Sequence, residues 1–123
     1  MDQAETLLSV RISAEWRTGP LWVTTSGDRF EDNAEPEDLA EKFGVSVELV
    51  AELNEWDDEF QQIWDPADPA SAEFPSEEAE VRWEERGRRL AEKLAAELGP
   101  TVRVSYYKEI IQAGATDRER EDD

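Results

Sequence analysis

The chain has 123 residues, enough for one domain whose hydrophobic core needs no covalent cross-links. It contains neither Cys nor His, which excludes disulfides, thiolate catalysis and the ligands most common in zinc sites. With 13 basic and 32 acidic residues its net charge is −19, which argues against direct binding to nucleic acid or anionic lipid.

Two strands are predicted at the start of the chain, joined as a β-hairpin. Apolar and polar residues alternate from Leu8 to Trp16, the period-two pattern of a strand with one buried face. Residues 18–20 (Thr-Gly-Pro) are typical of a turn, and residues 21–25 are rich in β-forming side chains. Residues 29–35 are polar and acidic, and we expect them to form an irregular connection.

Two helices are predicted next, the first over residues 37–43 and the second from about residue 47 to Trp64. Pro36 suits the first turn of the first helix, and Gly44 suits the position just after its end. Ser46 is a good N-cap for the second helix. That helix has an apolar stripe at spacings of three and four residues, made of Leu49, Leu53, Trp56, Phe60 and Ile63. Residues 65–71 contain two prolines and predict a loop.

The longest predicted helix begins at Pro75-Ser76 and ends at Leu98, before Gly99-Pro100. Gly87 in its middle costs roughly 1 kcal/mol relative to Ala, so we expect it to admit a bulky neighbour such as a Trp of the second helix. Glu84–Arg88 and Glu85–Arg89 have the i,i+4 spacing of ion pairs on a solvated face. Residues 101–107 alternate again and predict the last strand.

These elements predict an α+β fold with the order β-β-α-α-α-β. The simplest closure is a three-stranded antiparallel sheet with the helices on one face, the last strand pairing with the first. We expect residues 1–115 to form a single acidic domain and residues 116–123 a disordered charged tail. No basic, apolar leader begins the sequence and no apolar run approaches the roughly 20 residues of a membrane span, so a cytoplasmic location is expected.

The negative charge is concentrated in one part of the chain. Nineteen of the acidic residues and only two of the basic ones lie between Asp28 and Glu80, which gives this stretch a net charge of −17. Such a localised charge attracts basic proteins. The alternative is a salt-adapted surface with no basic partner, for which stability should rise with salt as self-repulsion is screened.

Three other functions have less support in the sequence. No motif indicates an active site, and close carboxylate pairs arise by chance among so many acids, so we expect no enzyme activity and no cofactor. The consecutive acids Asp57, Asp58 and Glu59 point in different directions on a helix and do not converge on a metal ion. Residues 39–50 resemble a helix-turn-helix, but the second helix presents Glu48 and Glu52 where a DNA reader needs bases or amides.

The candidate binding site is the acidic face of the second predicted helix. A Trp at the edge of a charged patch is a common interface anchor. Trp22 lies on the strand face opposite Leu21 and Val23, and Trp64 lies where the helix meets the loop, whereas Trp56 and Trp83 fall on core stripes. The predicted partner-binding residues are Glu48, Glu52, Glu55, Asp58 and Glu59, with Trp64 and Trp22 as anchors.

The whole chain resembles small acidic immunity proteins of bacterial toxin systems and related uncharacterised actinobacterial proteins. The similar segments are Val10 to Trp16 with Gly19 to Trp22, Trp56 to Phe60, and Phe74 to Ser76 leading into Glu78 to Leu98. The resemblance implies an inhibitor that neutralises a basic partner, such as a nuclease toxin, and it carries over no functional residues. The alternative is a DNA mimic, in which the carboxylates replace phosphates and several DNA-binding proteins are bound weakly.

Overall fold

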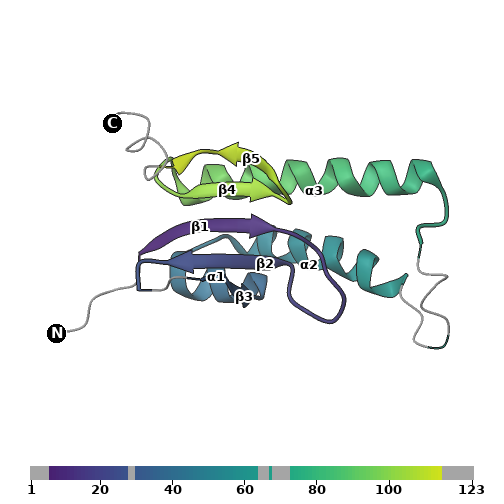
Figure 1. Cartoon of the computed structure of the whole chain (residues 1–123), viewed down its shortest axis with the longest axis horizontal. Coiled ribbons are helices and arrows are strands. Elements are labelled where there is room, and N and C mark those ends of the chain that lie inside the picture. The colour runs from purple at the N-terminus through teal and green to yellow at the C-terminus, as the bar shows by residue number, and fades with distance from the viewer. Residues whose placement is uncertain (1–5, 28–29, 64–66, 68–72, 115–123) are drawn as a thin grey trace.

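The computed structural model describes residues 6–27, 30–63, 67 and 73–114, which form a single sheet with three helices. All three helices lie on one side of the sheet, behind the strands in Figure 1, and no described helix covers the other face. The α+β class predicted from the sequence is confirmed. The predicted tail and most of the predicted 65–71 loop lie outside the described residues.

The sheet has five strands in the order β3-β2-β1-β4-β5. Their bounds are β1 Leu7–Ile12, β2 Leu21–Thr25, β3 Asp32–Ala34, β4 Arg103–Tyr106 and β5 Glu109–Gln112. The pairs β1–β2, β2–β3 and β4–β5 are antiparallel, and β1–β4 is parallel. The sheet is therefore mixed.

The predicted three-stranded antiparallel sheet is wrong in two respects. Two edge strands, β3 and β5, join the sheet from segments with no clear strand pattern. The last predicted strand does pair with the first, as expected, but in parallel. The direction follows from the 22-residue helix that precedes β4, because this helix runs the length of the sheet and returns the chain to the end at which β1 begins (Figure 1).

The first strand is also shorter than predicted, since it ends at Ile12 instead of continuing to Trp16. Residues beyond it form the long connection to β2, and the ring of Trp16 stacks on Phe60 with centroids 4.0 Å apart. The alternating pattern thus continues past the strand because the loop residues also pack on the protein.

The three helices are α1 Pro36–Phe43, α2 Val47–Gln62 and α3 Glu77–Leu98, close to the predicted ranges. The Ser46 hydroxyl accepts a hydrogen bond from the backbone N–H of Leu49 at 3.2 Å, as expected of an N-cap. Gly44 ends α1 with a φ of 75°, a left-handed conformation that favours glycine. Local capping signals therefore set the helix bounds.

The core lies between the sheet and the helices, and its centre is aromatic. Trp56 of α2 is fully buried and stacks on Trp83 of α3 with centroids 4.4 Å apart. Each indole N–H donates to the other residue's backbone carbonyl, at 2.9 and 2.8 Å. A Cβ on Gly87 would lie 2.7 Å from atoms of Trp56 and of Tyr106, which confirms the prediction that this glycine admits a Trp of the second helix.

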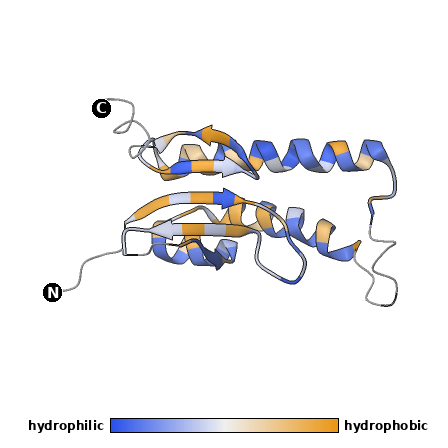
Figure 2. Cartoon of the chain, in the orientation of Figure 1, coloured by the Kyte–Doolittle hydropathy of each residue, from blue (hydrophilic) through white to orange (hydrophobic). Residues whose placement is uncertain are grey.

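Figure 2 shows hydrophobic residues alternating along β1 and mostly hydrophilic ones on the N-terminal half of α3.

Candidate functional site

The structure concentrates negative charge on the helical layer. Helices α1 and α2 together carry nine acidic residues and one basic residue, Lys42. The five strands carry two acidic and two basic residues. The acidic surface predicted from the sequence is thus carried by the helices, while the strands are electrically balanced.

Three of the five predicted acidic residues form ion pairs with α3. Arg86 bridges Glu55 at 3.1 Å and Glu59 at 2.9 Å, and the Lys93 ammonium lies 3.0 Å from Glu52. Exposed pairs of this kind contribute roughly 0–1 kcal/mol each to stability, but they neutralise charge locally. The sequence predicts an acidic face of α2 but does not indicate these basic partners, which lie 27 to 41 residues away along the chain.

The two other predicted acids, Glu48 and Asp58, are exposed on α2. Neither has an ion-pair partner among the residues that the structure describes. Their carboxylate charge is therefore not neutralised by any described residue. They are the predicted site residues best suited to attract a basic partner without a competing role in the fold.

The two predicted anchors do not join this surface in the structure. Trp22 alternates along β2 with Leu21 and Val23, which pack in the core, so it lies on the face of the sheet away from the helices, where its indole N–H donates to the Ser13 carbonyl at 3.1 Å. The Arg11 guanidinium lies 5.2 Å from the centre of the Trp22 ring, and Arg11 also pairs with Glu31. Trp64 lies outside the described residues. The predicted set is thus divided between opposite faces.

Asp57, on α2, has a buried carboxyl, which the sequence pattern does not distinguish from its acidic neighbours Asp58 and Glu59. The residue is 8% exposed, and burial raises the pKa of its carboxyl from 3.8 to about 6. A hydrogen bond from Gln61 at 3.2 Å opposes this shift, and nearby Glu35 adds to it. Gln61 also bonds to the backbone of Glu15 and Arg17, so this group fixes the loop between β1 and β2. We assign Asp57 a structural role.

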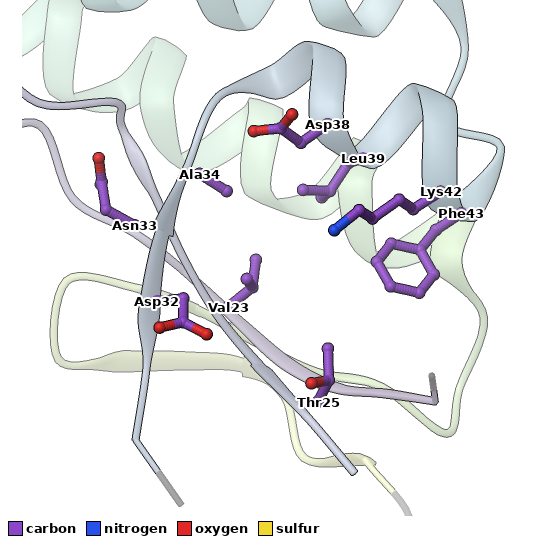
Figure 3. A pocket seen from close by; sticks show the side chains of 9 residues that line it. All are labelled: Val23, Thr25, Asp32, Asn33, Ala34, Asp38, Leu39, Lys42 and Phe43. Atoms are coloured by element: carbon purple, nitrogen blue, oxygen red, sulfur yellow. The ribbon is translucent and has the colours of Figure 1, made fainter. Parts of the chain in front are cut away.

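A small pocket of about 210 Å³ lies between α1 and the strands β2 and β3 (Figure 3). Its polar lining is largely engaged in the fold: the Asp38 carboxylate caps α1 by accepting from the Glu35 backbone N–H at 2.9 Å, and the Asn33 amide donates to two backbone carbonyls. Lys42 extends into the cavity from α1. The pocket has no nucleophile with an adjacent base, and it does not indicate an active site.

Within the described ranges, no helix is both long and apolar enough to cross a bilayer. No group of three or more carboxylates in those ranges is arranged to hold a metal ion.

A comparison with protein families gives one informative match. The model of a family described as Serratia CdiI immunity protein-like matches residues 8–109, which is most of the chain. The matched range runs from the second residue of β1 to the first residue of β5. No curated protein matches the chain significantly.

Proposed function

Because this chain belongs to the Serratia CdiI immunity protein-like family, we propose that it neutralises a basic cognate toxin, such as a nuclease, through its acidic helical surface. Family membership implies neutralisation of a CDI toxin by binding of the toxin domain, and an immunity protein of this kind is not an enzyme. The basic nature of the toxin and its nuclease activity are our additions.

The observation that carries the proposal is the charge of α2, which has five carboxylates besides the buried Asp57 and no basic residue. A nuclease needs a cationic cleft to hold phosphates, and an acidic helix is complementary to such a cleft. Complementary charge speeds the encounter of the two proteins and disfavours wrong partners. Glu48 and Asp58 supply this field most directly, with Glu52, Glu55 and Glu59 at the seam with α3.

The same proposal assigns the place of action. A nuclease toxin reaches its substrate inside the bacterial cell, so the immunity protein acts in the cytoplasm. The DNA-mimic alternative has less support, because a mimic needs a row of unpaired carboxylates and three acids of α2 are paired with Arg86 and Lys93. Family membership favours one cognate partner over several DNA-binding proteins.

The test is an activity assay on the toxin domain of the cognate CDI toxin. We expect the domain to cleave DNA or RNA and to lose that activity on addition of about one equivalent of the chain. A toxin domain with no nuclease activity would contradict the assignment of the toxin class. A nuclease that stays fully active with excess chain present would contradict the proposed function itself.

A further inference from the structure

Helix α3 extends beyond the β4–β5 hairpin (Figure 1), and a second acidic site lies between this helix and Tyr106, the last residue of β4. Here a groove of about 470 Å³ is lined by Val81, Glu84, Glu85, Arg88 and Tyr106. Val81 is apolar, yet half of its surface is exposed. The groove thus combines an apolar wall with charged groups, and its volume is sufficient for a long side chain.

The charge of the groove is negative once its ion pairs are considered. Arg88 pairs with Glu109 of β5, whereas the sequence spacing predicted a pair with Glu84. Glu84 and Glu85 have no ion-pair partner among the residues described. The groove therefore presents two carboxylates whose charge is not balanced by the nearby arginine, and this charge is complementary to a cation.

A buried polar atom at the groove gives independent evidence for a ligand. Tyr106 is only 8% exposed, and its hydroxyl has no hydrogen-bond partner within the part of the chain that the structure describes. The ring is held beside Trp56 and edge-on to Tyr107, at centroid distances of 6.1 and 4.8 Å. Tyr106 and Glu84 line the same groove, and burial raises the pKa of the Tyr106 phenol, with the charges of Tyr107 and Glu84 adding to the shift. Buried hydroxyls are nearly always hydrogen-bonded, so an unpaired one suggests that its partner is supplied by another molecule.

We propose that this groove receives an arginine or lysine side chain of the toxin. Its alkyl stem packs on Val81, and its cationic group pairs with Glu84 and donates a hydrogen bond to the Tyr106 hydroxyl. Glu85 adds to the attraction at the mouth. The inference rests on the proposed function, because it takes the partner to be the same basic toxin, and it assigns that partner a contact separate from α2.

The sharpest test is Tyr106→Phe, which removes only the unpaired hydroxyl. We expect the Kd for the toxin domain to rise about tenfold, the typical effect of losing a hydrogen bond to a charged group. The free chain should unfold at the same temperature as the wild type or higher, since no bond within it is lost. The matched control is Tyr107→Phe, whose hydroxyl accepts from the Ala14 backbone N–H at 3.3 Å. That variant should be less stable and keep its Kd within about twofold.

A second variant, Glu84→Gln with Glu85→Gln, tests the charge of the groove. We expect an increase in Kd of about tenfold or more, with the variant still folded and in the same oligomeric state as the wild type. If both sets of variants bind the toxin with the wild-type Kd, or if they change only self-association, the groove is not a toxin site. The proposed function would then still stand, because it is judged separately by whether the wild-type chain neutralises the toxin at all.

Discussion

Reversing the charge of Glu48 and Asp58 together should weaken binding to the toxin domain by about 100-fold or more. Both side chains are exposed on α2 and lack ion-pair partners among the described residues, so under the proposed function their carboxylates attract the basic partner directly. In Glu48→Lys with Asp58→Lys, attraction is replaced by repulsion at two points, and like-charge contacts across an interface cost several kcal/mol. About 1.4 kcal/mol corresponds to a tenfold change in Kd. Titration calorimetry or surface plasmon resonance measures the effect.

The structure also shows why these two positions are better than the neighbouring acids. Reversal at Glu52 or Glu55 would place a lysine against Lys93 or Arg86, and a loss of binding could then reflect damage to the α2–α3 contact. The matched control is Glu73→Lys with Glu92→Lys, which makes the same change in net charge at exposed positions outside α2. If both double variants lose affinity equally, only the net charge matters. If neither does, α2 is not the binding surface.

Replacing Asp57 by asparagine should stabilise the protein at neutral pH by about 1–3 kcal/mol, because a shift of one pKa unit corresponds to about 1.4 kcal/mol. Burial raises the pKa of this carboxyl to about 6 in the folded state, against 3.8 for an exposed Asp. Between these two values the folded protein binds more protons than the unfolded chain, so the free energy of unfolding contributed by Asp57 falls as pH rises. Above pH 6 the buried carboxyl is ionised, and the full free-energy cost of burying its charge is present. Asn removes this cost while keeping an acceptor for Gln61.

Urea unfolding of wild type and Asp57→Asn at about pH 7.5 and pH 3.5 measures this effect, since the stabilisation should vanish at the lower pH. The adjacent Asp58→Asn is the control, and at this exposed position we expect a change within about 0.5 kcal/mol. A variant Asp57→Asn that is less stable than wild type at pH 7.5 would mean that the ionised carboxylate is stabilised by its surroundings.

The helices could be predicted from the sequence because their signals are local. Ser46, Gly44 and Pro36 act on the turn in which they lie, and the apolar stripes repeat with the helical period. The two edge strands could not be predicted in the same way. In β3, the sequence Asp-Asn-Ala has low strand propensity, and it is held by pairing with β2 and by the Asn33 amide, which bonds to the carbonyls of Gly19 and Leu21.

The second missed strand, β5, follows a turn that has no glycine signal, since Tyr107 adopts a φ of 56°. The direction of β4 depends on the path of α3, which no local pattern encodes. From the sequence, the candidate site could be predicted only as a region of negative charge. The ion pairs of Arg86 and Lys93, the burial of Asp57 and the groove at Tyr106 all arise from contacts between distant segments.

The most direct test of an acidic surface that binds a basic toxin is the rate of association at increasing salt concentration. Stopped-flow or surface plasmon resonance measurements with the toxin domain would cover about 20 to 500 mM NaCl. We expect the association rate constant to fall by about tenfold or more over this range while the dissociation rate constant changes much less, because screening acts mainly on the steered encounter. An association rate constant that does not depend on salt would contradict electrostatic recognition by α1 and α2.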